Sequence, residues 1–226
     1  MIPSKIMTIT LSIFALLSPP LAAQTSVEVN TLKIEGLVVG VPQKIDADFA
    51  SEHGVAVPKP FQFTIPTDRT KNIKVQYPPE VAGLFKYNFA TEDNRYRSGL
   101  HVVPFSYRQN IPFEFNQNVE GGPLDILAHV AKMGFAGAVV DLDKSEIDAT
   151  RQTEIGPYQA VEAIGRYAEA DGTVVVLRVV ALTEKEGETD GLIAIISALP
   201  ETTGMKSVGD IVYVDGSRAL GTLRFE

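Results

Sequence analysis

The sequence predicts an α+β domain, a sandwich whose sheet is mostly antiparallel. The hydrophobic fraction of 45% is enough for a packed core, and the charged fraction of 21% is ordinary for a globular domain. Segments with strand patterns follow one another in runs, and helix patterns stand apart from them, as in α+β proteins. The clearest run is expected within residues 158–199, where a hairpin signal, Asp171-Gly172, joins two of three consecutive antiparallel strands.

The first elements are expected to be short. Residues 24–40 mix aliphatic residues with single charges and could form a strand pair or an ordered arm. Residues 44–53 favour a short helix that ends at Gly54. Residues 61–65 alternate apolar and polar side chains, which predicts a strand. Prolines on both sides of that strand favour the edge of a sheet, where a missing N–H costs no ladder hydrogen bond.

The middle of the chain predicts further strands and one clear helix. Alternation predicts a strand at residues 73–77, and residues 84–89 and 100–107 are predicted to form two further strands. The helix is predicted at Pro123–Met133, since proline suits the first helical turn and Gly134 suits the left-handed position after the last turn. Apolar side chains share one face of this helix, namely Leu124, Leu127, Val130 and Ala131.

The second half is expected to be rich in strands. Strands are predicted at residues 138–142, 159–168, 173–182 and 192–198. The tail allows more than one interpretation. The apolar spacing of residues 205–212 fits a helix, whereas residues 211–214 before Asp215-Gly216 fit a hairpin, and residues 220–223 could lie on a short last helix.

The N-terminus has the pattern of a secretory signal peptide. Lys5 is the only charged residue among the first 23, and the apolar run Ile6–Leu17 follows it. A small-residue exit then favours cleavage after Ala23. The alternative, an uncleaved membrane anchor, needs about 20 apolar residues, and this run is shorter. We therefore expect residues 1–23 to be a signal peptide and the protein to be periplasmic or secreted.

The mature chain is expected to hold one domain. Cleavage removes one lysine and no acid, which leaves 203 residues with a net charge of −9. No later stretch has the length and apolarity of a membrane span, so we expect a soluble protein without transmembrane anchoring after cleavage. We expect residues 24–54 to be an N-terminal arm or extension and residues 55–226 to be a single α+β domain.

Composition and motifs argue against several kinds of function. The whole chain has 28 acidic against 20 basic residues, a balance that disfavours nucleic acid as a partner. The absence of cysteine excludes disulfides, thiol nucleophiles and Cys-ligated zinc. A search for phosphate-binding loops, nucleophile elbows and zinc-binding helices finds none. The sequence therefore predicts no catalytic residue, no metal ligand and no cofactor.

Three weaker patterns could be functional sites, but each is explained more simply by an ordinary surface role. Residues 141–145 begin like a calcium loop, but the glycine and glutamate required later in an EF-hand are missing, so a solvated turn is favoured. Asp125 and His129 lie four residues apart on the predicted helix, which is more typical of a surface pair than of a metal or catalytic site. The acidic residues of 184–190 could bind a cation weakly, although a solvated hairpin loop is the simpler interpretation.

One aromatic and basic set is the best candidate for an interaction surface. Tyrosine and arginine are favoured at interfaces because they combine a large contact area with strong polar groups. In an acidic chain, such a set could meet an acidic partner. The candidate residues lie near the ends of expected strands and are Arg95, Tyr96, Arg97, Tyr107 and Arg108.

The order of these patterns resembles the PsbP/Mog1/DcrB-like family. The early strand Phe61–Pro66, the segment Ile155–Glu162 before three strands, and the closing run Ala219–Phe225 carry the resemblance, which covers residues 55–225. It implies an α/β/α sandwich with a mostly antiparallel sheet, which acts by binding or scaffolding and usually without catalysis. It is a resemblance of pattern, and no functional residue follows from it.

These observations predict an exported, non-catalytic binding or scaffold protein of the cell envelope. Its partner would be a protein or small ligand in the envelope that the sequence does not identify. The alternative is an envelope hydrolase with a dispersed Ser/His/Asp-type site around His129 or His101.

Overall fold

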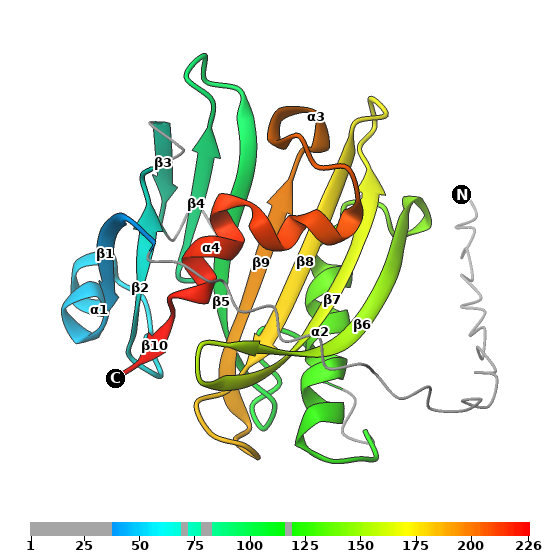
Figure 1. Cartoon of the computed structure of the whole chain (residues 1–226). Helices are drawn as coiled ribbons and strands as arrows, with labels where there is room; N and C mark the ends of the chain where they lie inside the picture. The colour runs from blue at the N-terminus through cyan, green and yellow to red at the C-terminus, as the bar shows by residue number, and fades with distance from the viewer. Residues whose placement is uncertain (1–37, 69–71, 78–82, 116–118) are drawn as a thin grey trace, which may run out of the picture.

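A seven-stranded sheet forms the centre of the molecule. The computed structural model describes residues 38–68, 72–77, 83–115 and 119–226, and the expected signal peptide lies outside them. Within this part of the chain, every neighbouring pair in the sheet is antiparallel, in the order β3-β4-β5-β9-β8-β7-β6 (Figure 1). The strands are β3 (Asn72–Gln76), β4 (Phe85–Ala90), β5 (Tyr96–Ser106), β6 (Ser145–Ile155), β7 (Tyr158–Ala168), β8 (Val174–Leu182) and β9 (Asp190–Ala198).

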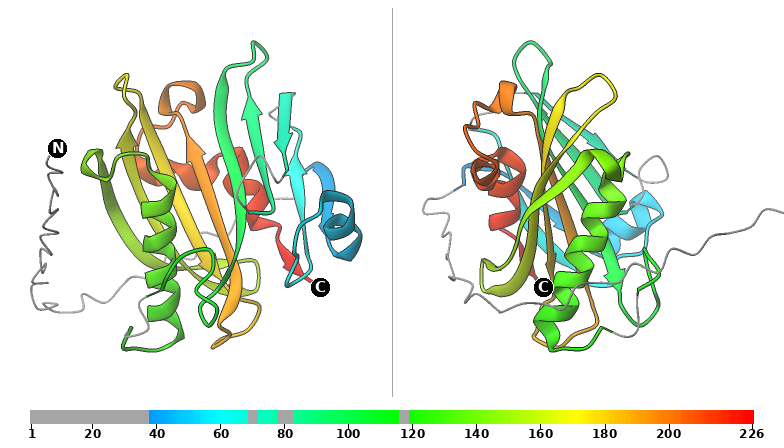
Figure 2. Two further views of the ribbon diagram at one scale, coloured as in Figure 1. Left: turned by 180° about the vertical axis from the view of Figure 1, so that it is seen from behind. Right: turned by 90° about the vertical axis from the view of Figure 1, so that its right-hand side faces the viewer.

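Helices and a small second sheet cover the two faces of this sheet. The helix α2 (Pro123–Ala138) packs on one face, and α4 (Asp215–Gly221) lies on the other (Figure 2). A three-stranded sheet, formed by β1 (Gly40–Ile45), β2 (Phe61–Pro66) and β10 (Arg224–Phe225), shares a core with the α4 face. The short helices are α1 (Ala47–His53), α3 (Pro200–Thr203), η1 (Leu142–Lys144) and η2 (Val208–Tyr213). The predicted α+β class and the mostly antiparallel sheet are confirmed.

Side chains that alternate along the central strands pack into two cores, one on each face of the seven-stranded sheet. In β8, Val176, Val180 and Leu182 join the core on the α4 side, and Val175, Leu177, Val179 and Ala181 join the core under α2. The result is a strand with almost every side chain buried, which explains its unbroken apolar sequence. At about 25 cal/mol per Å², burial of such side chains is the main force that holds the layers together.

The helix α2 is longer than the sequence predicts. It begins at Pro123 as expected, and the backbone N–H of Gly122 donates to Asp125 Oδ2 at 2.8 Å. It then continues through Gly134 to Ala138. Gly134 is not a C-terminal cap but a contact residue, because a Cβ there would lie 2.9 Å from a methyl group of Val179. Glycine therefore serves close packing between helix and sheet.

The described part of the expected N-terminal arm packs on the domain. Ile45 and Phe49 are buried in the core that also contains Phe61, Phe63 and Phe85. The rings of Phe63 and Phe85 stack with centroids 5.3 Å apart. The short helix α1 ends at Gly54 as predicted, and the φ of 65° at Gly54 is the left-handed conformation that favours glycine after a helix.

Several expected elements need correction. The strand β2 is not at an edge, since it lies between β1 and β10, and Pro66 is its last residue. The strand predicted at residues 138–142 does not form, because Ala138 still belongs to α2 and Leu142 opens η1. The strand β6 was not predicted because most of its side chains are exposed and many are charged. In the tail, the helical interpretation is correct and the hairpin does not form.

A buried ion-pair trio joins three strands on the α4 side. The carboxylate of Glu162 on β7 is fully buried and accepts from Arg151 Nε on β6 and Arg178 Nε on β8, each at 2.6 Å. Arg178 is also buried, whereas a quarter of the Arg151 side chain is exposed. A buried carboxylate requires such partners, because an unpaired charge would be costly away from water.

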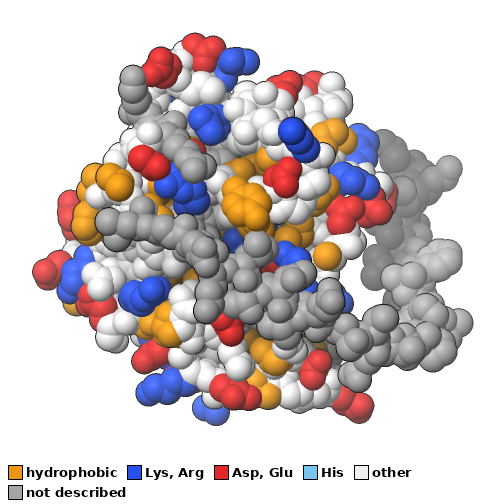
Figure 3. Space-filling view, in the orientation of Figure 1, with side chains coloured by type: hydrophobic (Ala, Val, Ile, Leu, Met, Phe, Trp, Pro, Cys, Tyr) orange, Lys and Arg blue, Asp and Glu red, His pale blue; other side chains and the backbone are white. Residues whose placement is uncertain are grey.

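Charges are mixed on the face that carries α4. Acidic and basic side chains are interspersed over its described part (Figure 3). In the described ranges, the helices are too short or too polar for any of them to cross a bilayer.

Candidate functional site

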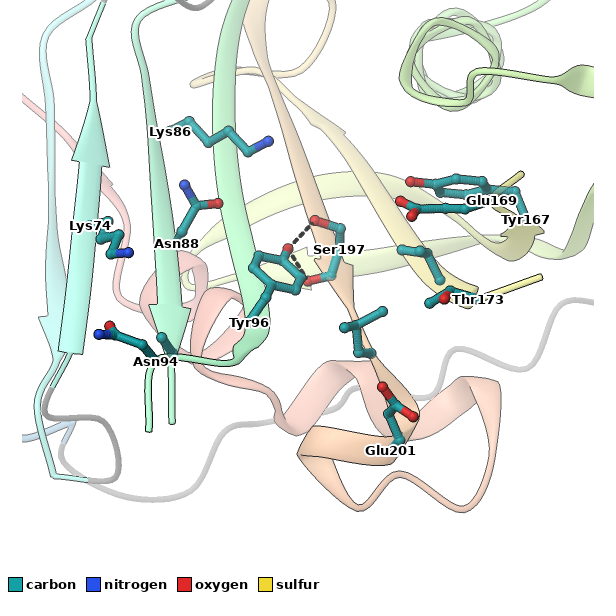
Figure 4. Close-up of a pocket in the computed structure, with 13 residues that line it drawn as sticks. Lys74, Lys86, Asn88, Asn94, Tyr96, Tyr167, Glu169, Thr173, Ser197 and Glu201 are labelled. Atoms are coloured by element: carbon teal, nitrogen blue, oxygen red, sulfur yellow. Dashed lines mark hydrogen bonds between the residues drawn. The ribbon is translucent and has the colours of Figure 1, made fainter. Parts of the chain in front are cut away.

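The α2 face of the sheet is only partly covered and contains a groove. Helix α2 packs mainly against β7 and β8 and ends at Ala138. Elsewhere on this face, residues of β3, β4, β5, β7, β8 and β9 line a groove of about 600 Å³ (Figure 4). The end of β9 and the start of α3 contribute the last lining residues, Leu199 and Glu201.

Strand register brings the groove's polar side chains into one row. Lys74 on β3 lies opposite Asn88 on β4, Asn88 lies opposite Gly99 on β5, and Gly99 lies opposite Ser197 on β9. In β4 every second residue is a buried aromatic, so Asn88 and Lys86 point to the opposite face, into the groove. The alternation of β4 therefore places aromatic side chains in the core on one face and polar side chains in the groove on the other.

The floor is organised around Gly99. A Cβ at this position would lie 2.7 Å from the Tyr96 hydroxyl and 3.2 Å from Ser197 Oγ. Because glycine leaves this space open, the Tyr96 hydroxyl reaches β9, where it donates to the Ser197 carbonyl at 3.1 Å and lies 2.6 Å from Ser197 Oγ. This cross-strand contact fixes the tyrosine on the floor of the groove.

Burial keeps the groove's tyrosines neutral. Burial raises the pKa of Tyr96 to about 12, and the nearby Tyr167 and Glu169 act in the same direction against the Ser197 hydrogen bond. Burial, followed by the charge of Glu169, also raises the pKa of Tyr167. The ionised form of both hydroxyls is therefore even less favoured than that of a free tyrosine.

The walls of the groove carry opposite charges. Lys74 and Lys86 stand on one side, and Glu169 stands on the other; Lys86 and Glu169 point toward each other (Figure 4). Glu201 lies at the α3 end. In the described part of the chain, none of these four side chains makes an ion pair. Arg166, in contrast, pairs with a glutamate at 2.7 Å elsewhere on the surface.

A second hollow of about 320 Å³ adjoins the groove and shares Lys86, Tyr167 and Ser197 with it. It lies between the sheet and the C-terminal end of α2. His101, directly opposite Lys86 in the β4–β5 pair, lines this hollow together with Phe113. The hollow is more apolar than the groove, so the two together offer a polar surface that continues into an apolar one.

The five residues of the predicted interaction surface lie in separate places in the structure. Tyr96 lines the groove. Arg95 is exposed in the β4–β5 turn, where its Nε donates to Asp93 at 2.8 Å. Arg97 points to the opposite face of the sheet, where its guanidinium lies 4.0 Å from Asp215 on α4.

Tyr107 and Arg108 follow the other end of β5. This strand has 11 residues, so Tyr107 lies about 36 Å from Tyr96 along the strand. The ring of Tyr107 packs on Phe115 with centroids 5.1 Å apart. Of the five predicted residues, the structure therefore places only Tyr96 in the groove, and the five do not form one patch.

The three histidines lie in three different places. His53 stacks on Tyr77 with ring centroids 4.0 Å apart, and His101 lines the second hollow. His129 lies on α2, and its buried Nε2 has no hydrogen-bond partner among the described residues. Burial, with a smaller effect of Lys132, lowers the pKa of His129. The structure thus brings no two imidazoles together.

The acidic residues of 184–190 already hold a cation from the chain itself. Lys59 Nζ lies 2.9 Å from the Glu184 carboxylate and also pairs with Glu188. Burial opposes ionisation of Glu188, but the hydrogen bonds from Lys59 and from the Lys185 backbone, together with the charges of both lysines, hold its pKa below the ordinary value. The lysine thus occupies the position that a weakly bound cation would take.

The start of the calcium-like sequence is an ordinary turn. Asp141 caps η1 and pairs with Lys144 at 3.3 Å. Over the described ranges, the structure has no cluster of three or more histidine, aspartate or glutamate side chains that could hold a metal ion.

Sequence reasoning missed most of the groove. Lys74, Lys86 and Asn88 are the polar members of alternating strands, and that alternation was the available signal. Ser197 is the polar, half-buried residue next to the end of the buried strand β9. What the sequence could not supply was the strand order, which puts β9 beside β5 and so brings Ser197 to Tyr96.

Comparison with known proteins gives likeness of structure only. No family model and no curated protein matches the sequence. The chain is similar to the solution structure of cyanobacterial PsbP (CyanoP) from Synechocystis sp. PCC 6803, with 11% identity and a TM-score of 0.47 over 84% of this chain and 96% of that one. It is also similar to the crystal structure of LpqN, described as involved in cell envelope biogenesis of Mycobacterium tuberculosis, with 9% identity and a TM-score of 0.44 over 81% and 90%. A PsbP protein is thus among the solved structures that this chain resembles.

Proposed function

We propose that this chain is an exported, non-catalytic binding protein of the cell envelope and that the groove on the α2 face is its binding site. The observation that carries the proposal is the groove's pair of oppositely charged walls, whose side chains have no ion-pair partners in the described part of the chain. Its volume of about 600 Å³ lies within the range typical of small-molecule sites.

The floor supports binding because it is already organised. The Tyr96–Ser197 contact is formed within the chain, so a ligand does not have to order this side chain. Export rests on the pattern of residues 1–23, which predicts a chain that begins at Gln24 after cleavage. N-terminal mass analysis of the protein from the envelope fraction tests this cleavage directly.

A pair of tryptophan variants tests the groove. Asn88→Trp puts a large ring on the groove floor, and Gln152→Trp makes the same change at an exposed position on β6. Each tagged variant is cross-linked in cells, purified from the envelope and analysed by mass. We expect the wild type and Gln152→Trp to capture the same molecule and Asn88→Trp to lose it. Equal capture by all three proteins would contradict the proposal.

The hydrolase alternative has its own test. His101 lies beside the groove, and His129 lies apart from it on α2. Each is changed to alanine, and the wild type and variants are tested on generic ester, glycoside and phosphate substrates. A turnover activity of the wild type that His101→Ala abolishes would favour an enzyme over a binding protein.

A further inference from the structure

We infer that the ligand of the groove is a short peptide of about four residues, bound extended with its carboxyl end at Lys74 and Lys86 and its amino end at Glu169. This inference rests on the proposed function and adds the class of ligand. Its basis is the charge, the span and the floor of the groove.

Charge complementarity sets the direction of the ligand. The two lysines come from β3 and β4, and Glu169 follows β7 at the opposite wall. Lys86 and Glu169 point toward each other, with Tyr96 and Ser197 between them (Figure 4). A ligand with a carboxylate at one end and an ammonium group at the other would pair with both walls. A simple anion would leave the acidic wall unpaired.

The span between the walls sets the length. In the sheet order, β4 and β7 are four strand steps apart, or about 19 Å between backbones at about 4.8 Å a step. The lysine and glutamate side chains lean inward, so their charged groups are closer together than this. An extended chain spans about 3.4 Å per residue, so about four residues reach roughly 14 Å. A single amino acid is too short to meet both walls.

The floor suits a peptide backbone. The Asn88 side chain and Ser197 Oγ lie in one cross-strand row below the span. Asn88 Nδ2 has one exposed bond to Gln76 at 3.3 Å, and no partner of its amide oxygen exists in the described ranges. The amide oxygen can accept from a peptide N–H, and the hydroxyl can accept from an N–H or donate to a C=O, and both peptide groups recur along an extended chain.

Calorimetric titration of the protein purified from the envelope tests the inference with four probes. The probes are tetraalanine with free ends, N-acetyl-tetraalanine, tetraalanine amide and alanine. We expect tetraalanine to bind and alanine not to bind. Blocking either end should weaken affinity about tenfold or more, the loss expected for a charge-assisted hydrogen bond.

Wall variants assign each end of the peptide. In the double variant Lys74→Gln with Lys86→Gln, amidation of the probe should no longer weaken binding further; in Glu169→Gln, acetylation should no longer do so. Lys132→Gln, an exposed lysine on α2, is the matched control and should bind like the wild type.

Two results would overturn the inference. They are equal affinity for blocked and free tetraalanine, and failure of tetraalanine to bind. If tetraalanine fails while Asn88→Trp still abolishes capture in cells, the ligand class is wrong and the binding function stands. If Asn88→Trp leaves capture intact, the proposed function itself falls.

Discussion

Removal of the buried carboxylate of Glu162 should destabilise the protein more than any single surface change. Glu162 is fully buried between Arg151 and Arg178, with both Nε–Oε distances at 2.6 Å. In Glu162→Ala, the side chain of Arg178 would stay buried on β8 without its only ion-pair partner in the described part of the chain. The guanidinium charge of Arg178 would then lie in the core without water or a carboxylate to stabilise it.

The size of the effect follows from the burial of the pair. Loss of one partner from a buried ion pair costs about 3–5 kcal/mol. Arg151 adds little to this, since a quarter of its side chain is exposed and its charge can turn to solvent. With an m-value of about 3 kcal/mol per molar urea, the unfolding midpoint should fall by about 1.0–1.7 M.

Urea unfolding followed by circular dichroism measures this shift. Glu154→Ala, at an exposed position on β6, is the matched control and should leave the midpoint within about 0.2 M of the wild type. The double variant Glu162→Leu with Arg178→Met removes both charges and should recover most of the loss, because apolar replacement of a buried pair is often neutral or stabilising. A loss below about 1 kcal/mol in Glu162→Ala, or no recovery in the double variant, would refute the reasoning.

Three further predictions concern packing and pH. Gly134→Leu should lower the free energy of unfolding by about 1–3 kcal/mol, despite the better helix propensity of leucine, because a Cβ there would lie 2.9 Å from Val179; an unchanged urea midpoint would contradict this. Backbone N–H groups lower the pKa of Asp46 and Asp210 below 3.8 in the fold, so stability should be full above that value and fall as the pH drops through the folded pKa values. Midpoints measured between about pH 6 and pH 3 should show this fall, and changing both residues to asparagine should flatten it. Burial and a nearby lysine lower the pKa of His129, so its NMR titration midpoint should lie below 6.5, and a midpoint at or above 6.5 would count against its buried position.

The fold could be predicted from the sequence where local patterns agree with packing. The three strands β7, β8 and β9 and their antiparallel order follow from apolar runs and the Asp171-Gly172 turn. The start of α2 follows from Pro123 in the same way. Its end could not be predicted, because Gly134 resembles a helix stop and only the nearness of the sheet shows why glycine is used inside the helix.

The groove could not be predicted because it depends on strand order. Tyr96 was singled out for its neighbours in sequence, Arg95 and Arg97, yet the three side chains point to different places. Its true neighbour is Ser197, about a hundred residues away and adjacent only because β5 pairs with β9. Long-range register of this kind has no signal in a single alternating strand.

Site-specific photo-cross-linking tests the central claim, that the groove binds a ligand, most directly. A photoreactive phenylalanine replaces Tyr167 on the groove wall in one protein and Tyr213 on η2 in another. Tyr213 is 60% exposed, whereas Tyr167 is partly buried. Labelling that followed exposure alone would therefore favour position 213. We predict that irradiation in cells yields a defined adduct from position 167, which Asn88→Trp abolishes, and none from position 213. Equal adducts from both positions, or an adduct at 167 that Asn88→Trp leaves unchanged, would contradict the claim.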